Sequence, residues 1–317
     1  MVTSALSIGI YYTVPKPLQL SVIIPTCDRP SLLRSCLRGL EAARQALQPG
    51  QCEIIVSDDG HGRETMQMLG SEFPLIEWTA GPQRGPAANR NRGARQACGE
   101  WLVFIDDDCL PNVGLLRSYC DAIEARPQAS VFEGRIISDR EKRHPLEECP
   151  INDNGGNLWS CNFAIRADAF ASLHGFEERF PHAAGEDADL CYRLRKANHC
   201  ISFVADAFVV HPWRRRSWRA HLRQHRQMLN ADLLRISLNP ELVNHFTFWN
   251  VCKDVVRYYA RSFIADVRKF GFSAFAYQPV FLLIQSLRAF GYARRRGCGV
   301  ISSGVQMTDQ RASAGKS

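Results

Sequence analysis

Three groups of acidic residues stand out in this 317-residue chain because of the positions that they occupy. Asp58-Asp59-Gly60 and Asp106-Asp107-Asp108 each follow a short run of apolar residues typical of a buried strand, and Gly185-Glu186-Asp187 opens a stretch with helical spacing. Neighbouring carboxylates repel one another unless a cation lies among them, because like charges raise each other's pKa. A hard divalent cation with oxygen ligands is therefore expected where these groups meet.

Each acidic group also has a purely structural explanation. Acidic residues are common in turns after strands, and at helix N-termini they complement the helix dipole. That explanation fits Asp58-Asp59 as well as a ligand site does, and it accounts for Glu186 or Asp189. It fits three aspartates at the end of a buried strand less well. A carboxylate of the third group can also serve as a general base toward a substrate hydroxyl.

The elements that must position these groups are predicted by apolar spacing. Residues 20–24, 53–56 and 101–105 are apolar on both faces, as in buried parallel strands. Residues 31–47 carry apolar side chains three and four apart, which predicts a helix, and another helix is expected over 86–97. Strands that alternate with helices over residues 18–210 predict a doubly wound α/β fold, in which ligands bind at the carboxyl ends of the strands.

Four sequence blocks together resemble the family 2 glycosyltransferases of the GT-A fold, which invert the configuration of the transferred sugar. They are residues 20–29 (LSVIIPTCDR), 54–60 (IIVSDDG), 85–108 (GPAANRNRGARQACGEWLVFIDDD) and 185–194 (GEDADLCYRL). Their order and spacing match that family over residues 18–211, about two thirds of the chain. The resemblance implies a GT-A nucleotide-diphospho-sugar transferase fold, with a mostly parallel, doubly wound sheet and here a C-terminal helical extension.

The resemblance also implies which residues line the donor nucleotide. Those after the first strand are Pro25, Thr26, Asp28 and Arg29. Asp58 corresponds to the acidic residue that contacts the base, uracil or another. Arg90 corresponds to an arginine near the base, with Arg92 as the alternate.

The catalytic and metal-binding residues follow from the resemblance in the same way. Asp106 and Asp108 match a D-x-D motif that holds Mg²⁺ or Mn²⁺ against the donor diphosphate, while Asp107 is left to face the ribose or a phosphate. His211 is either a third metal ligand or a capped loop residue. Asp187 is the expected catalytic base. Asn157, Trp159 and Cys161 are candidates to face the acceptor or the donor sugar.

The resemblance implies transfer from a nucleotide-sugar, by default a UDP-sugar, to an acceptor hydroxyl on a glycan, such as a lipid-linked glycan or a cell-surface polysaccharide precursor. A pyrophosphorylase needs a GxGTR-like loop, and a dehydrogenase needs GxGxxG; the first strand is followed by neither. A catalytically inactive relative that only binds the nucleotide-sugar remains an alternative.

The formal charge of +7 divides unevenly along the chain. Residues 1–210 carry 21 basic and 27 acidic residues, whereas residues 211–317 carry 18 basic and 5 acidic residues. The arginine-rich and aromatic stretch that begins at Trp213 is compatible with nucleic-acid phosphates, an anionic membrane surface, the diphosphate product or a solvated helix face. We favour peripheral membrane association and expect no nucleic acid, because the basic residues lie outside the α/β pattern.

The expected organisation has four parts. They are an N-terminal extension (1–17), a catalytic domain (18–211, with a nucleotide half 18–108 and an acceptor half 109–211), a basic aromatic helical segment (212–300) and a disordered tail (301–317). The 12 cysteines form no CxxC pair and indicate reduced thiols. No signal peptide or clear membrane span is predicted, and the most apolar late stretch, 270–292, is interfacial in character. The expected location is cytoplasmic, with possible attachment to the inner face of the membrane.

Overall fold

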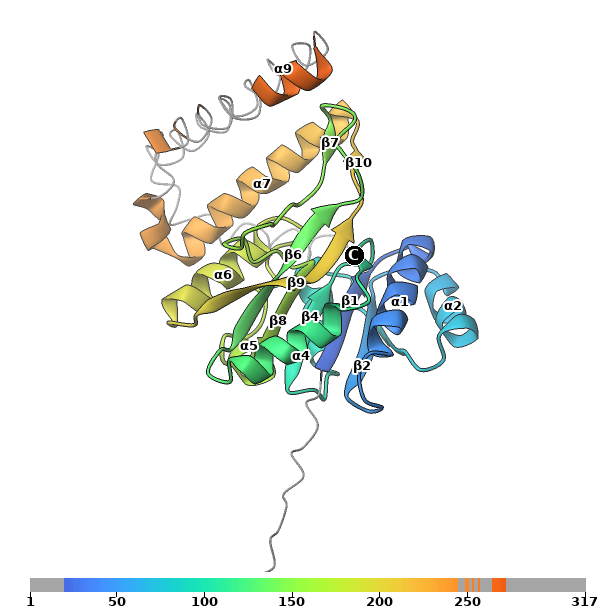
Figure 1. Ribbon diagram of the computed structural model, residues 1–317. Coiled ribbons are helices and arrows are strands. Elements are labelled where there is room, and N and C mark those ends of the chain that lie inside the picture. Colours follow the sequence, from blue (N-terminus) through green and yellow to red (C-terminus); the bar gives the residue numbers. More distant parts are fainter. Residues whose placement is uncertain (1–19, 245–248, 251–252, 254–255, 257–263, 272–317) are drawn as a thin grey trace, which may run out of the picture.

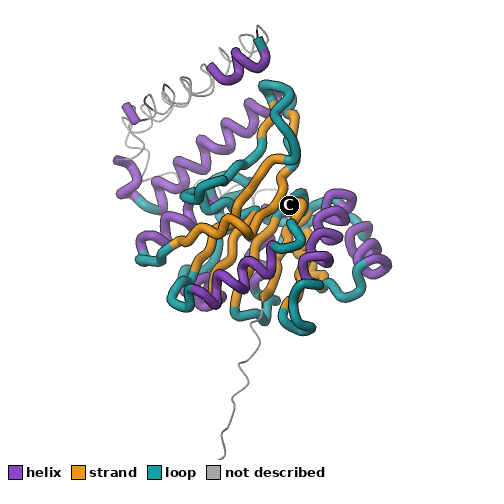
Figure 2. The backbone as a smooth tube through the Cα atoms, in the orientation of Figure 1, coloured by secondary structure: helices purple, strands orange, loops and turns teal. Residues whose placement is uncertain are grey.

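The computed structural model describes residues 20–244, 249–250, 253, 256 and 264–271. Their centre is an eight-stranded sheet in the order β3-β2-β1-β4-β8-β6-β9-β5, with helices against both faces (Figures 1 and 2). The strands are β1 (Leu20–Thr26), β2 (Cys52–Asp58), β3 (Glu77–Ala80), β4 (Trp101–Ile105), β5 (Leu110–Pro111), β6 (Val131–Ser138), β8 (Asn162–Arg166) and β9 (Ile201–His211). A separate two-stranded sheet pairs β7 (Glu147–Glu148) with β10 (Arg214–Arg215).

The described part of the chain contains helices with defined bounds, and residues 249, 250, 253 and 256 are helical as well. The helices with defined bounds are α1 (Pro30–Arg44), α2 (Glu64–Glu72), α3 (Pro86–Ala94), α4 (Leu115–Ala125), α5 (Ala167–Ser172), α6 (Glu186–Lys196), α7 (Trp218–Leu238), a 3₁₀ helix (Pro240–Asn244) and α9 (Ile264–Phe270). None of the helices in these described residues has the length and hydropathy of a membrane span.

The sheet is parallel in its first half and mixed in its second. Strands β3, β2, β1 and β4 all run in one direction, so the chain segments that follow β1, β2 and β4 meet at one edge. Strand β8 runs antiparallel to both β4 and β6, while β9 runs parallel to β6. The expected α/β fold with parallel nucleotide-binding strands is confirmed, and the antiparallel strand β8 makes the remainder mixed.

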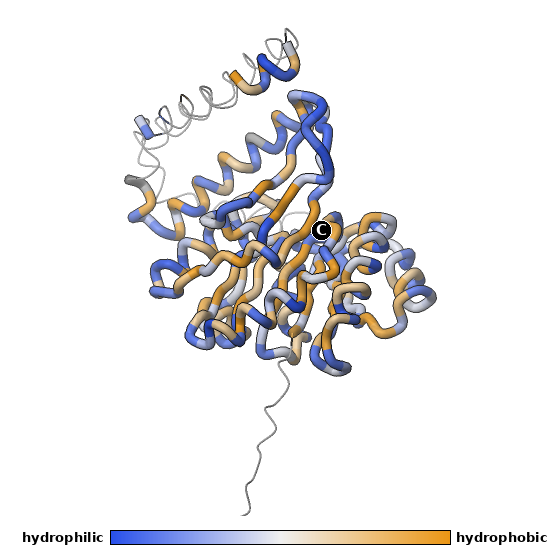
Figure 3. Tube along the Cα trace, viewed as in Figure 1, coloured by the Kyte–Doolittle hydropathy of each residue, from blue (hydrophilic) through white to orange (hydrophobic). Residues whose placement is uncertain are grey.

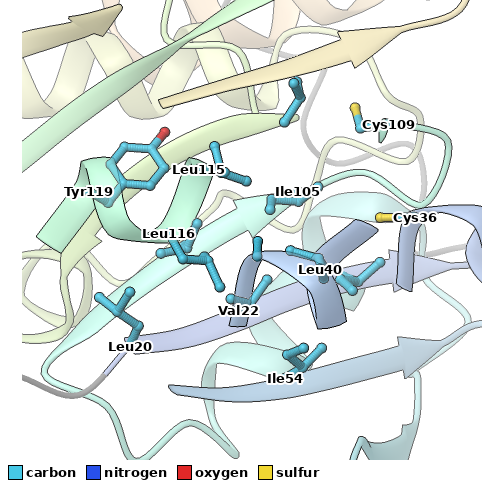
Figure 4. Packing of buried hydrophobic residues seen from close by; sticks show 14 of the residues in the cluster. Leu20, Val22, Cys36, Leu40, Ile54, Ile105, Cys109, Leu115, Leu116 and Tyr119 are labelled. Carbon is cyan, nitrogen blue, oxygen red and sulfur yellow. The ribbon is translucent and has the colours of Figure 1, made fainter. Parts of the chain in front are cut away.

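The core has two layers because successive side chains of a strand point to opposite faces of the sheet. Val22 and Ile24 of β1 join the cluster that packs against α1 and α4, part of which Figure 4 shows, whereas Ile23 joins the cluster on the other face. The apolar residues gather along the strands in Figure 3, and the two-stranded β7–β10 sheet is hydrophilic. Because β1 and β4 are buried on both faces, the core packing holds the ends of these strands in place.

Predicted helix ends differ slightly from the observed ones. The helix predicted over 31–47 is α1, which ends at Arg44, and the helix predicted over 86–97 is α3, which ends at Ala94. Residues 95–99 instead turn into β4, and the Gly99 amide donates to Ser21 Oγ at 2.8 Å. The N-terminal extension, the tail from residue 301 and nearly all of the stretch 270–292 lie outside the described residues.

Candidate active site

A cleft of about 630 Å³ lies at the carboxyl ends of the parallel strands. Pro25 and Thr26 of β1 line it, together with Arg29, which follows that strand. Asp106 and Asp108 reach it from the end of β4. The sequence prediction that these segments meet at one sheet edge is therefore confirmed.

The three consecutive aspartates take different positions. Asp106 and Asp108 line the cleft, whereas Asp107 lies beneath it with no exposed surface. Thr26 Oγ1 donates to Asp107 Oδ2 at 2.7 Å, and an Arg29 guanidinium nitrogen lies 2.8 Å from Asp107 Oδ1. Burial raises the pKa of Asp107 to about 6. This contact with Thr26 links the end of β4 to the end of β1, which favours a supporting role for Asp107.

Arg90 of α3 lies between two carboxylates that are far apart in the sequence. Its guanidinium donates to Asp106 Oδ1 at 2.6 Å and to Glu186 Oε1 at 3.0 Å, and only 2% of its side chain is exposed. Burial raises the pKa of Asp106, but the Arg90 guanidinium lowers it further and holds it below its ordinary value. Arg90 therefore joins the D-x-D strand end to helix α6, a role that the family resemblance did not indicate.

Asp108 and His211 form a pair suited to a cation. His211 Nε2 lies 3.4 Å from Asp108 Oδ1, and both residues are buried. The other ring nitrogen, Nδ1, lies 3.0 Å from the Pro212 carbonyl oxygen, which only accepts, so Nδ1 carries the proton. Burial lowers the pKa of His211 and keeps the ring neutral.

The lone pair of His211 Nε2 consequently faces a carboxylate oxygen. Two acceptors at this distance fit a metal ion that both would ligate, with the Nδ1 contact fixing the ring. Cys109 Sγ lies near the same atoms, but its hydrogen bond with Cys161 and its burial hold the pKa of the thiol well above its ordinary value. The protonated thiol is a poor ligand, so Asp108 and His211 are the better candidates.

The cleft also carries arginines that suit a diphosphate. Arg214 contacts Asp108 Oδ2, and Arg29 lies 3.6 Å from the same oxygen. Arg216 lines the cleft and pairs with Glu148 of β7 at 2.8 Å. Planar guanidinium groups match phosphate oxygens in bidentate geometry. Two arginines of the basic stretch thus lie in the cleft rather than on an outer helix face.

The residues expected at the base end of the nucleotide are spread more widely. Asp58 is buried, and its carboxylate accepts from the Gly60 amide at 2.8 Å. The neighbouring Asp59 lines the cleft, and its carboxylate accepts from the Gln83 amide at 2.8 Å. Asp28 is exposed and accepts from the His61 amide at 3.1 Å. Asp59 is a candidate that the sequence argument did not single out, although the paired aspartates signalled it.

Asn89 of α3 is a buried residue that the sequence argument missed. Its amide nitrogen donates to the Thr26 carbonyl at 3.1 Å and to the Ser57 carbonyl at 2.9 Å, and Ser57 Oγ donates to its side-chain oxygen at 2.6 Å. Because it also lines the cleft, Asn89 fixes the spacing between the ends of β1 and β2. Nothing local in the sequence indicated these contacts. Arg92, the alternate to Arg90, instead donates to Thr79 Oγ1 and the Ala80 carbonyl beside β3.

Asp187, the expected base, lines a second pocket of about 250 Å³. Asn157 and Trp159 line the same pocket, whereas Cys161 is buried in the core beside Cys109. Burial raises the pKa of Asp187. A carboxylate with a raised pKa in a pocket is suited to accept a proton from a hydroxyl.

The adjacent Glu186 carries the contact to Arg90. Burial and then the charge of Asp187 raise the pKa of Glu186 to about 7. Because Arg90 also donates to Asp106, the residues Glu186, Arg90 and Asp106 form one chain of contacts. Helix α6 thus places Glu186 in contact with Arg90, which lines the cleft, and Asp187 in the second pocket.

Comparisons with known proteins show which family this part of the chain resembles. The model named "Glycosyl transferase family 2" matches residues 21–174. This part of the chain is therefore similar to glycosyl transferase family 2. That match covers β1 from its second residue, all of β2 and β4, and the aspartates at the ends of β2 and β4, whereas α6 and His211 lie beyond it.

Two curated relatives are similar over most of the chain. The pre-mycofactocin glycosyltransferase of Mycobacterium tuberculosis is 27% identical over 222 residues, which are 63% of this chain and 44% of that protein. The validoxylamine A glucosyltransferase of Streptomyces hygroscopicus subsp. limoneus is 28% identical over 273 residues, 73% of this chain and 59% of that protein. The chain therefore spans about half of the length of these relatives.

Solved structures of low sequence identity share the fold. S. aureus TarS 1-349 in complex with UDP has a TM-score of 0.51 at 20% identity, covering 72% of this chain and 71% of that chain. The mannosyltransferase PcManGT from Pyrobaculum calidifontis, in complex with GDP-Man and Mn²⁺, has a TM-score of 0.57 at 15% identity, covering 89% and 87%. These similarities support the GT-A assignment.

Proposed function

We propose that this protein is a metal-dependent, inverting glycosyltransferase that moves a sugar from a nucleotide-sugar, with a UDP-sugar as the first candidate, to an acceptor hydroxyl. The observation that carries the proposal is the pair of acceptor atoms, Asp108 Oδ1 and His211 Nε2, that face each other beside arginines in the cleft. The glucosyltransferase activity of one relative and the nucleotides bound in the solved neighbours support it.

Asp108 and His211 would hold the ion, with Asp106 on the same side of the cleft. A bound Mg²⁺ or Mn²⁺ supplies charge stabilisation for the departing nucleoside diphosphate. Arg29 and Arg214 are placed to bind the phosphate oxygens of that leaving group. We propose uridine as the nucleoside of the donor and Asp59 as the residue that contacts its base.

Asp187 takes the proton of the acceptor hydroxyl as that oxygen attacks the anomeric carbon. The bond from the anomeric carbon to the phosphate oxygen breaks while the new glycosidic bond forms, and the electron pair leaves with the diphosphate. A single displacement of this kind inverts the anomeric configuration, by analogy with inverting glycosidases. We propose as acceptor a glycan of the lipid-linked or polysaccharide-precursor type, because one relative is a GalNAc(5)-diNAcBac-PP-undecaprenol beta-1,3-glucosyltransferase.

Nucleotide binding is expected to depend on the metal and on Asp108. UDP with Mn²⁺ should raise the melting temperature, since a ligand at 100 times its Kd adds about 2.7 kcal/mol to the free energy of unfolding. The melting temperature is also measured with GDP and with dTDP, each with Mn²⁺, as the alternative nucleotides. Asp108→Asn should remove the part of the shift that depends on Mn²⁺, whereas Asp153→Asn, at an exposed pair with Arg135, should retain it. Equal nucleotide stabilisation with Mn²⁺ or with EDTA would contradict the proposed metal site.

We also propose that the outer face of α7 contacts an anionic membrane surface. Arg219, Arg223 and Arg226 are exposed and spaced to share one face, and Leu222 between them is 48% exposed. The protein should co-sediment with phosphatidylglycerol vesicles at low salt, and this binding should be lost at high salt. Because each arginine contributes about 1 kcal/mol, replacing Arg219, Arg223 and Arg226 together by glutamine should weaken binding about tenfold or more. Equal binding to neutral vesicles would count against this surface.

A further inference from the structure

The second pocket has a composition that indicates the chemistry of its ligand. It lies between one face of α6 and the loop 156–159, and α7 closes one side with Arg235. On α6, the pocket residues Ala188, Cys191, Tyr192 and Arg195 recur at three- and four-residue intervals, so they share one face. The pocket thus has a mainly apolar wall with a small number of charged groups.

The apolar part of this pocket suits a sugar ring. The Trp159 side chain is 39% exposed on the loop side, and Tyr192 stands on the helix side, where its hydroxyl donates to Glu241 at 2.7 Å. Aromatic rings combine a large apolar face with a polar edge, which matches the mixed surface of a sugar. Asp187 lines the same space, so a hydroxyl of such a ring would lie beside the proposed base.

The charged part of the pocket is positive. Three of its ten lining residues are charged, namely Asp187, Arg195 and Arg235. An Arg195 guanidinium nitrogen lies 3.4 Å from the Gly156 carbonyl oxygen, and one of Arg235 lies 3.4 Å from the Ala188 carbonyl oxygen. These contacts orient both guanidinium groups along the pocket walls. Asp232, on the same helix as Arg235, is 3.7 Å away from it.

We infer that the acceptor bound in this pocket is a sugar that carries a phosphate ester, with its ring against Trp159 and its phosphate at Arg195 and Arg235. The inference rests on the proposed glycosyl transfer, because it assigns the pocket to the acceptor. Arginine binds phosphate in bidentate geometry, and two guanidinium groups favour this anion over a neutral glycoside. The phosphate belongs either to a free sugar phosphate or to a lipid-linked sugar diphosphate.

The test measures acceptor binding while the donor cleft is occupied. The full chain is saturated with UDP and Mg²⁺, and the dissociation constants of three sugar 1-phosphates are measured by saturation-transfer NMR. The sugars are glucose, galactose and N-acetylglucosamine, each paired with its methyl glycoside as the neutral control. At least one 1-phosphate should bind about tenfold or more tightly than its methyl glycoside, as charge-assisted hydrogen bonds require.

Variants assign that preference to the two arginines. Arg195→Gln and Arg235→Gln should each lower the preference for the phosphate about tenfold, whereas Arg117→Gln, on the exposed face of α4, should retain it. Arg195 is exposed, so its variant is expected to fold even if the Arg235 variant does not. Equal binding of phosphates and methyl glycosides, or a preference that survives Arg195→Gln, would overturn the inference.

A further arm separates the two phosphate sources. Farnesyl-diphosphate-linked sugar in detergent should bind more tightly than the sugar 1-phosphate if the acceptor is lipid-linked, and equally if it is a free sugar phosphate. The thermal shift with UDP and Mn²⁺ reports on the donor cleft alone. A retained shift with no phosphate preference therefore rejects this inference, whereas no shift with UDP, GDP or dTDP rejects the proposed function.

Discussion

Asp187→Asn is expected to lower kcat for sugar transfer by a factor of about 10²–10⁴, the usual contribution of a general base. The amide occupies the same volume but cannot take the acceptor proton. Donor binding should persist, because Asp187 lines the second pocket and not the donor cleft. The measurement is the initial rate of product formation at saturating donor, together with the melting-temperature shift with UDP and Mn²⁺.

The matched control is Asp168→Asn, at an exposed aspartate in the first turn of α5. It should retain full activity. Burial raises the pKa of Asp187 above its ordinary 3.8, and the base must be deprotonated to act. The wild-type rate should therefore fall on the acid side at a pH clearly above 3.8. An Asp187→Asn enzyme with more than a tenth of wild-type kcat would mean that another group takes the proton.

Arg90→Met is expected to lower the free energy of unfolding by about 3–5 kcal/mol, the usual cost of leaving buried charges without their partner. Among the ion pairs of the described residues, Arg90 is the only cation that contacts both Asp106 and Glu186, and the substitution removes it. The side chain is 2% exposed and also lies 5.6 Å from the Phe176 ring centre. Urea denaturation followed by circular dichroism measures the loss.

The loss should depend on pH in a defined direction. Without Arg90, the folded-state pKa values of Asp106 and Glu186 rise, so the folded variant favours the protonated carboxyls. Stability that comes from a raised pKa is present at low pH and is lost as the pH rises through that pKa. The deficit should therefore be larger at pH 8 than at pH 5. Arg92→Met, two residues along α3, should cost less than 1 kcal/mol, and an equal cost for both variants would refute the buried network.

The parallel half of the fold was predictable because its strands are apolar on both faces. Residues 20–24, 53–56 and 101–105 each fall within an observed strand, with Asp58 as the last residue of β2 and Asp106 directly after β4. The antiparallel direction of β8 was not predictable, because a short apolar run has the same periodicity in either direction. Strand direction depends on how the chain returns to the sheet.

The site residues that adjoin a strand end were predictable. Their contacts with residues distant in the sequence were less so. Asp106 and Asp108 reach the cleft from the turn directly after β4, in which the Cys109 amide donates to the Asp106 carbonyl oxygen at 3.1 Å. The contact from Arg90 to Glu186 joins residues 96 apart, and Arg214 reaches Asp108 from beyond β9. No local pattern specifies such pairs. The family resemblance placed Arg90 near the base, whereas its guanidinium holds two carboxylates.

The most direct test of the central claim is the release of nucleoside diphosphate from UDP-glucose, UDP-N-acetylglucosamine, GDP-mannose and dTDP-glucose, with Mn²⁺ or with EDTA. We expect one donor to be turned over with Mn²⁺ and its turnover to stop with EDTA or with Asp108→Asn. Turnover that is unchanged by both EDTA and Asp108→Asn would contradict the account, as would no turnover of any donor in the presence of Mn²⁺ and a sugar acceptor.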